Sequence, residues 1–128
     1  MDEHSFIRAI HKQLHADLYH WKIRDSYTSG IPDTFYAGPK AILFIEYKFV
    51  KLPKRSTTLI KCNLSRLQNQ WLKQMDRFNV PVAVVIGTDH KHLILEKGDW
   101  EKTFFKESFE QGITIKEIAD WIYRRTYQ

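Results

Sequence analysis

Apolar residues recur along this chain at two different spacings, and each spacing predicts one kind of secondary structure. A spacing of three or four residues predicts a first helix over residues 2–18, from Ile7, Ile10, Leu14 and Leu18. The same spacing predicts a second helix after residue 63, with one apolar face made of Leu64, Leu67, Trp71, Met75 and Phe78. Two C-terminal helices are predicted, one over about 99–112 and one opening with a capping box of Thr114 and Glu117.

Short apolar runs of strand length lie between and after the helical segments. They predict strands over residues 19–24, 33–37, 41–50, 80–88 and 92–96. The basic segment 51–63 contains Pro53 and predicts a loop. The resulting order, αβββαβ, predicts an α/β fold with a mixed central sheet flanked by helices. We expect one domain over residues 1–128, with a core over about 2–96 and a C-terminal helical tail over about 99–128.

Composition and charge narrow the classes of function. The 128 residues carry a formal net charge of +5 and a pI of about 9.3, which suits a polyanionic partner, although a merely solvated basic surface gives the same values. No apolar run approaches the ~20 residues of a membrane span, and the N-terminus lacks a signal-peptide core, so we expect a cytoplasmic protein without a membrane partner. The single Cys62 excludes an intrachain disulfide, and the glycines form no nucleotide-binding loop, so no nucleotide cofactor is expected.

Histidine spacing offers a metal-site alternative. His11 and His15 have the i, i+4 spacing of a zinc pair, but no obvious third ligand accompanies them. We therefore expect them on a solvent-facing stripe of the first helix. His90 and His92 flank a predicted turn and are expected at the surface.

Three charged residues interrupt the apolar strand pair in the middle of the chain. With a two-residue turn at Pro39 and Lys40, residues whose numbers sum to 79 face each other, which places Asp33 opposite Glu46. Opposed carboxylates repel, so a divalent metal ion such as Mg²⁺ between them is the economical explanation. Strand alternation puts Lys48 on the same face as Glu46, where its ammonium can orient a water or stabilise a phosphate. A structural ion pair of Lys48 with either carboxylate is the alternative.

The sequence GIPD, followed by a hairpin and then FIEYK, resembles the PD-(D/E)XK nuclease superfamily. Together with the later SRLQNQWL, the pattern is most similar to the VRR-NUC and Holliday-junction-resolvase branch, over about residues 3–96. The resemblance implies a restriction-endonuclease-like core and metal-dependent hydrolysis of DNA phosphodiester bonds. It implies that Asp33, Glu46 and the backbone carbonyl of Tyr47 bind Mg²⁺, for which Mn²⁺ can substitute, and that Lys48 is the catalytic lysine.

Two further residues have a functional and a structural interpretation. Glu3 shares the inner stripe of the first helix, where members of the superfamily often carry an acidic residue that contacts the metal. An acidic residue in a first helical turn is also favourable with the helix dipole. Gln68 lies where a glutamine of the resembled branch reaches toward the catalytic lysine or the phosphate, but Ser65 and Gln68 also spell a capping box. Both interpretations stay open for each residue.

The chain departs from the resembled branch in the length of the segment before the second helix. This segment would lie beside the active site, so its basic residues are candidates for contacts with DNA phosphates, which position DNA without reading its sequence. The candidates are Lys51, Lys54, Arg55, Lys61 and Arg66. A solvated basic loop is the alternative.

These features together predict a small Mg²⁺-dependent DNA endonuclease that is specific for branched or junction DNA. A homodimer that cuts paired strands is compatible with this prediction. A phage or mobile-element endonuclease of the homing or repair type is the first alternative. A non-catalytic nucleic-acid-binding module, or a structural protein with a fortuitous motif, belongs to another functional class.

Overall fold

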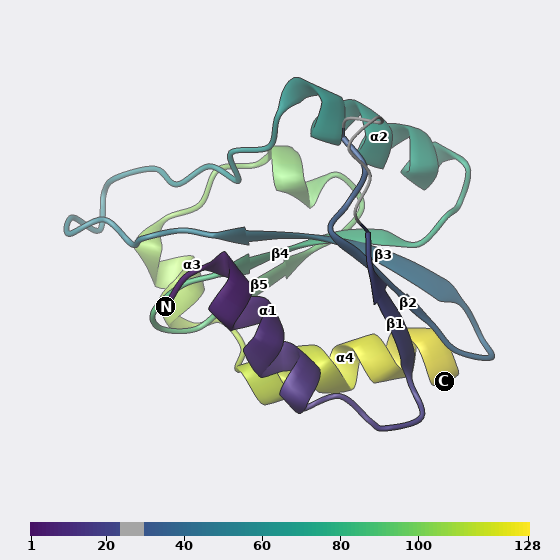
Figure 1. Ribbon diagram of the computed structural model, residues 1–128. Helices are drawn as coiled ribbons and strands as arrows, with labels where there is room; N and C mark the ends of the chain where they lie inside the picture. The colour runs from purple at the N-terminus through teal and green to yellow at the C-terminus, as the bar shows by residue number, and fades with distance from the viewer. Residues whose placement is uncertain (24–29) are drawn as a thin grey trace.

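The computed structural model describes residues 1–23 and 30–128, which form a five-stranded sheet with helices on both faces (Figure 1). In chain order, the elements are α1 (Glu3–Lys12), β1 (Tyr19–Lys22), β2 (Thr34–Ala37), β3 (Ile42–Phe49), α2 (Arg66–Arg77), β4 (Val82–Gly87), β5 (Leu93–Leu95), the 3₁₀-helix η1 (Asp99–Glu101), α3 (Lys106–Glu110) and α4 (Ile115–Tyr127). The strands lie in the order β1-β2-β3-β4-β5, with β3 and β4 parallel and the other neighbours antiparallel. The predicted α/β class and mixed sheet are confirmed.

Two apolar clusters hold the helices on the sheet. On one face, α1 and α4 bury Phe6, Ile10, Ile118 and Ile122 against the strands. On the other face, α2 and the segment from η1 to α3 pack on β4, and this cluster includes Leu72, Val84, Ile86, Trp100 and Phe109. Every residue of β4 is buried, as expected for a central strand that is covered on both sides.

The predicted hairpin register is confirmed. Phe35 pairs with Phe44 and Ala37 with Ile42, so the residue numbers sum to 79. The last pair in this ladder is Thr34 with Ile45, and Asp33 follows directly. Arg24, the last residue of the strand predicted over 19–24, lies outside the described residues.

The first helix is shorter than predicted. It ends at Lys12 instead of near Leu18, and hydrogen-bonded turns follow, with the N–H of Leu14 donating to the carbonyl of His11 and that of Leu18 to the carbonyl of His15. Leu18 is still buried, and Leu14 packs against the same cluster. These two leucines keep a helical spacing but fill the core from turns that lead the chain into β1.

The buried face of α2 also differs from the prediction. Leu72 is fully buried, whereas Leu67 and Phe78 are 49% and 62% exposed. The Ser65 side chain caps the N-terminus of α2. Gly30, in the segment before β2, packs closely against the backbone of α2. Leu64, Trp71 and Met75 of the predicted face do pack against the core, so the apolar spacing identified the helix and most of its inner face but missed Leu72 and wrongly included Leu67 and Phe78.

The C-terminal helical extension contributes to the core. The capping box of Thr114 and Glu117 is present, and α4 buries Ile118 and Ile122 against α1 and the sheet. The single helix predicted over 99–112 is wrong: Phe104 lies between η1 and α3 and exchanges two main-chain hydrogen bonds with Ile60. None of the described helices is long and apolar enough to cross a membrane.

Two histidines expected at the surface are partly or fully buried. His92 is 4% exposed, and its Nδ1 accepts a hydrogen bond from the N–H of Thr88. His11 is half-buried, with its Nε2 2.8 Å from the hydroxyl of Tyr36. Burial is the main cause that lowers the pKa of each imidazole to about 4, and the neighbouring His20 and Lys22 contribute to the shift of His11. The prediction failed because β1 lies beside α1 and β5 pairs beside β4.

Candidate active site

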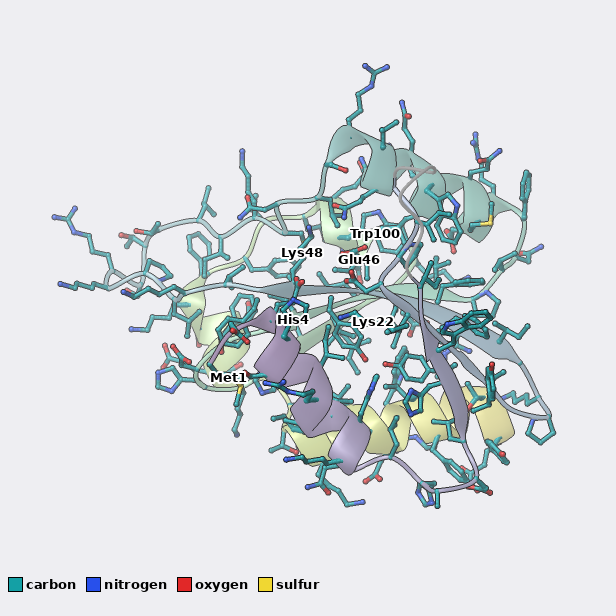
Figure 2. All side chains as sticks on the ribbon, viewed as in Figure 1. Met1, His4, Lys22, Glu46, Lys48 and Trp100 are labelled. Atoms are coloured by element: carbon teal, nitrogen blue, oxygen red, sulfur yellow. The ribbon has the colours of Figure 1, made fainter. Side chains whose placement is uncertain are left out.

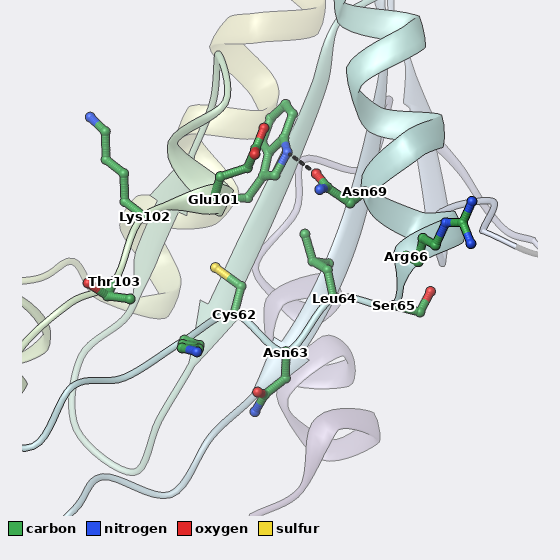
Figure 3. A pocket seen from close by; sticks show the side chains of 11 residues that line it. Cys62, Asn63, Leu64, Ser65, Arg66, Asn69, Glu101, Lys102 and Thr103 are labelled. Carbon is green, nitrogen blue, oxygen red and sulfur yellow. Dashed lines mark hydrogen bonds between the residues drawn. The ribbon is translucent and has the colours of Figure 1, made fainter.

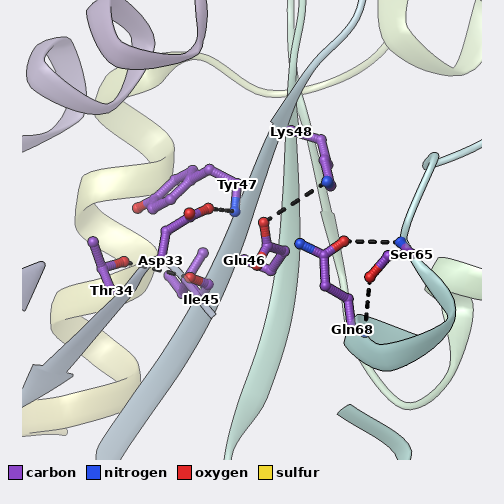
Figure 4. Close-up of polar contacts among 8 residues, drawn as sticks. All are labelled: Asp33, Thr34, Ile45, Glu46, Tyr47, Lys48, Ser65 and Gln68. Atoms are coloured by element: carbon purple, nitrogen blue, oxygen red, sulfur yellow. Dashed lines mark hydrogen bonds and ion pairs between the residues drawn. The ribbon is translucent and has the colours of Figure 1, made fainter. Parts of the chain in front are cut away.

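The structure brings Asp33, Glu46 and Lys48 together where β2 begins beside β3 (Figure 4). Glu46 and Lys48 project from the face of β3 that α2 covers, and Oε2 of Glu46 lies 4.0 Å from Nζ of Lys48. Asp33 directly precedes β2, and its Oδ2 accepts a 2.9 Å hydrogen bond from the main-chain N–H of Tyr47. The three charged residues predicted from the sequence are therefore neighbours in space.

The segment before β2 is held against α2 by a glycine. Gly30 has a φ of +90°, and a β-carbon built on it would lie 2.5 Å from the carbonyl oxygen of Leu67. Only glycine adopts this conformation at such a close approach without strain. The glycine of the GIPD sequence thus fixes the chain that delivers Asp33 to the site.

A hydrogen-bonded network on the opposite face of the sheet holds the two strands in register. The hydroxyl of Tyr36 lies 2.6 Å from that of Tyr47, and both side chains are fully buried. The Thr34 hydroxyl donates to the Ile45 carbonyl at 3.4 Å. Because β2 and β3 are fixed relative to each other here, Asp33 and Glu46 are fixed on the face above.

Burial and like charge dominate the electrostatics of the site. Glu46 is 3% exposed, and burial, followed by the neighbouring Asp33 carboxyl, raises its pKa well above the ordinary value, which Lys48 offsets only in part. Glu3 is half-buried, and burial together with Asp33 raises its pKa as well. The site therefore places the carboxyl groups of Glu46 and Glu3 where burial and a neighbouring carboxyl group favour the protonated form, unless a cation is bound beside them.

The donor chemistry of Asp33 and Glu46 fits a hard divalent cation. Mg²⁺ takes oxygen ligands and is commonly held by one or two carboxylates with waters and phosphate. Among residues 1–23 and 30–128, no three His, Cys, Asp or Glu side chains converge tightly enough to form a metal cage. A metal ion held by Asp33 and Glu46 would therefore take its remaining ligands from main-chain or solvent oxygens. The carbonyl oxygen of Tyr47 would be one of these ligands.

Gln68 combines the two interpretations of the sequence. Its Oε1 accepts a 2.9 Å hydrogen bond from the N–H of Ser65, and the Ser65 hydroxyl accepts one from the N–H of Gln68, so the capping box is formed. Because the amide oxygen of Gln68 accepts from Ser65, the amide nitrogen lies on the opposite side of the amide group and points toward Glu46 (Figure 4). The same side chain thus caps α2 and presents N–H donors to the site.

The basic residues expected to contact DNA are all exposed. Lys51, Lys54 and Arg55 lie in the segment after β3, Lys61 lies closer to α2, and Arg66 is the first residue of α2. Lys61 and Arg66 also line a cavity of about 410 Å³ beside the start of α2 (Figure 3). Cys62 lines the same cavity, but burial raises its pKa to about 11, so it carries a neutral thiol at physiological pH.

The sequence prediction missed a second group of basic residues near Glu3. Nζ of Lys22, the last residue of β1, lies 3.3 Å from Nδ1 of His4 in α1. His4 and Lys22, like Lys48, partly offset the raised pKa of Glu3, so Glu3 lies within electrostatic reach both of these two residues and of the Asp33–Glu46–Lys48 group. Figure 2 labels His4 on α1 and Lys22 on β1 together with Glu46 and Lys48, which both lie on β3. The alternation of β1, which puts His20 and Lys22 on one face, was the available signal.

Comparisons with known proteins identify the fold. The chain matches no family model and no curated protein sequence. Among solved structures, it is similar to Hjc, a Holliday junction resolvase from the archaeal hyperthermophile Archaeoglobus fulgidus, with a TM-score of 0.54 and 18% identity over 94% of this chain and 97% of that chain. The structural similarity extends through the C-terminal helices. It shows that this chain has the mixed α/β, restriction-endonuclease-like fold of that resolvase.

Proposed function

We propose that residues 1–128 form one nuclease domain that hydrolyses phosphodiester bonds of DNA in the presence of Mg²⁺, with Asp33, Glu46 and Lys48 as its catalytic residues. The observation that carries this proposal is the position of Asp33 above the Glu46–Lys48 pair in a fold similar to that of a resolvase. A buried Glu46 carboxyl group with a raised pKa, next to the carboxyl group of Asp33, is costly for a purely structural role. The same two carboxyl groups are useful if they bind a divalent cation that contacts a phosphate group.

Each residue has a defined role in the proposed reaction. Asp33 and Glu46 would hold Mg²⁺ together with the Tyr47 carbonyl, and the bound ion supplies Lewis-acid stabilisation of the phosphate and a more acidic water. Lys48 donates to a phosphate oxygen and stabilises the negative charge that develops as a new bond from phosphorus to the water oxygen forms and the bond to the leaving oxygen breaks. Gln68 orients Glu46 through its amide N–H. Mn²⁺, which accepts the same oxygen ligands, substitutes for Mg²⁺.

Glu3 approaches the acid pair from α1 and has a supporting role. Its carboxyl group interacts electrostatically with Asp33 and Lys48, although it lies on a different element from either. In the proposed site its carboxyl group would help to hold the metal. Its helix is capped by Asp2, which accepts a hydrogen bond from the N–H of Ser5, so Glu3 is not required as the cap.

Branched DNA is the proposed substrate class. The similarity to a Holliday junction resolvase favours it over linear DNA, and the exposed basic segment after β3 supplies phosphate contacts beside the site. A homodimer that cuts paired strands, membership of the VRR-NUC branch and an origin in a phage or mobile element belong to the same proposal. Size measurement in solution tests the dimer.

The second candidate is a nucleic-acid-binding module without catalysis. The exposed basic segment favours binding whether or not the acid pair is catalytic. The two candidates differ in what they require of Glu46, because a binding module gains nothing from a buried carboxyl group next to another.

The proposal is tested by conversion of supercoiled plasmid to nicked and linear forms in Mg²⁺ or EDTA. The wild type should cut in Mg²⁺ and not in EDTA, and Glu46→Gln should not cut. Glu110→Gln is the matched control, because Glu110 is an exposed residue of α3 far along the chain from the site. Loss of cutting in both variants would assign the effect of Glu46→Gln to general damage, and equal inactivity of all proteins with retained DNA binding would favour the binding module.

A further inference from the structure

A cleft of about 370 Å³ lies between α1 and β1 and is lined by cationic and imidazole side chains. These are His4, Arg8, His11, His20 and Lys22, and we call this surface the α1–β1 cleft. Its remaining lining residues are Ile7 and Trp21, so within residues 1–23 and 30–128 no carboxylate lines it. A concave surface with basic groups alone raises the local concentration of anions.

The cations of the cleft are available to a ligand. Among the described residues, neither Arg8 nor Lys22 forms an ion pair with an acidic side chain. Arg8 uses one guanidinium nitrogen to donate to the Ser5 hydroxyl at 3.3 Å, which leaves most of its donors free. Lys22 contacts His4 at 3.3 Å and retains further ammonium hydrogens. Two cations that line one cleft can both donate to a phosphate group.

The α1–β1 cleft lies on the face of the sheet that α1 covers, opposite the face that carries Glu46 and Lys48, and its Lys22 end is close to the chain that delivers Asp33. Lys22 pairs with Thr34 across the β1–β2 ladder, and the N–H of Ile23 donates to the carbonyl of Asp33 at 2.7 Å. Lys22 is thus one strand away from the residue that precedes β2. The basic segment that follows β3 begins at Lys51, three residues beyond Lys48. A nucleic-acid backbone that passes the acid pair would have cations available on both sides.

We propose that the α1–β1 cleft binds a phosphodiester group of the DNA backbone through Arg8 and Lys22, as a second contact separate from the basic segment 51–66. This inference rests on the proposed function, because the ligand is the same DNA that the acid pair would cut. It adds Arg8 and Lys22, which the sequence pattern did not identify, as DNA-contacting residues. It also adds a second point at which the backbone of the bound DNA contacts the protein. His4, next to Lys22, holds the ammonium toward the cleft.

The test measures DNA binding of proteins that carry Glu46→Gln, so that no cleavage interferes. The probe is a fluorescently labelled four-way junction, titrated between about 50 and 200 mM KCl, where phosphate contacts dominate the salt dependence. The test variant adds Arg8→Gln and Lys22→Gln. The control variant adds Lys40→Gln and Arg124→Gln, which remove the same charges at exposed positions, one in the hairpin turn and the other near the end of α4.

The proposal predicts at least a tenfold weaker affinity for the test variant and a slope of log K against log[KCl] that is smaller by about 0.9, the value for one phosphate contact. The control variant should keep both values close to those of the parent. Lys22→Arg, in place of Lys22→Gln, should restore most of the affinity. Thermal unfolding of each variant verifies that the fold is intact.

Other outcomes separate this inference from the proposed function. A test variant that binds the junction as tightly as the control variant does would overturn the proposed role of the α1–β1 cleft in DNA binding, even if the wild type cuts DNA. A wild type that does not cut, combined with the predicted change of slope, supports the cleft and rejects the nuclease. A parent protein that binds no DNA overturns both.

Discussion

The main-chain N–H of Tyr47 donates a 2.9 Å hydrogen bond to Oδ2 of Asp33. Tyr47 lies between Glu46 and Lys48, and its side chain points to the opposite face of the sheet, where its hydroxyl meets that of Tyr36 at 2.6 Å. One residue therefore orients the acidic side chain through its backbone and fixes the strand register through its side chain. This coupling links the stability of the core to the geometry of the candidate site.

Removal of a hydroxyl from this network should affect stability more than cleavage. Tyr36→Phe leaves the Tyr47 hydroxyl and His11 Nε2 without their buried partner, which should lower the free energy of unfolding by about 1–2 kcal/mol. The hydrogen bond from Tyr47 to Asp33 involves no tyrosine hydroxyl, so cleavage at low temperature should be nearly unchanged. Urea denaturation measures the first effect. Tyr19→Phe, at an exposed position of β1, is the control and should be neutral.

Loss of one charge from the acid pair should separate stability from metal binding. Asp33→Asn keeps an oxygen that can accept from the N–H of Tyr47 but removes the carboxylate that raises the pKa of Glu46. Without metal, this variant should be at least as stable as the wild type, because a repulsion is gone. Mg²⁺ at about 100 times its Kd should stabilise the wild type by about 2.7 kcal/mol and leave the variant unchanged. Thermal unfolding with and without Mg²⁺ checks both, and equal Mg²⁺ stabilisation of the two proteins would remove Asp33 from the metal site.

A substitution of Gln68 can separate its role in capping α2 from its proposed role in DNA cleavage. Gln68→Glu keeps an oxygen for the N–H of Ser65 but loses the amide nitrogen that points toward Glu46. Its thermal stability should be close to that of the wild type, whereas cleavage should fall by about tenfold or more. Ser65→Ala is the complementary control: it should lose about 1 kcal/mol of stability through the cap and keep its activity. Full activity of Gln68→Glu would reduce Gln68 to a capping residue.

The buried His92 should make the fold sensitive to acid. Its pKa is about 4 in the folded protein and about 6.5 when exposed, because burial disfavours the charged imidazole. The unfolded chain therefore binds a proton that the folded chain does not, and stability present above pH 6.5 is lost as the pH falls toward 4, by about 2–3 kcal/mol. His92→Gln should flatten this part of the stability profile measured by urea denaturation. The exposed His90→Gln should leave the slope unchanged.

The sequence predicted the features that depend on local patterns and missed those that depend on which elements become neighbours. The hairpin register followed from Pro39 and Lys40 and from strand alternation, so the proximity of Asp33 and Glu46 was predictable. The end of α1 was not, because Leu18 fills the core from a turn at a helical spacing. The α1–β1 cleft was missed because Arg8 and Lys22 meet only through the packing of α1 beside β1. The metal, the DNA contacts and the roles of Glu3 and Gln68 stay predictions.

The most direct test of the central claim is single-turnover cleavage of a labelled four-way junction and a linear duplex of the same sequence, in Mg²⁺ or EDTA, by the wild type and Glu46→Gln. The account predicts cleavage by the wild type in Mg²⁺ alone, faster on the junction than on the duplex, and none by Glu46→Gln. Cleavage that persists in Glu46→Gln would contradict the proposed active site. A wild type that binds both DNAs and cuts neither in Mg²⁺ or Mn²⁺ would contradict the nuclease itself.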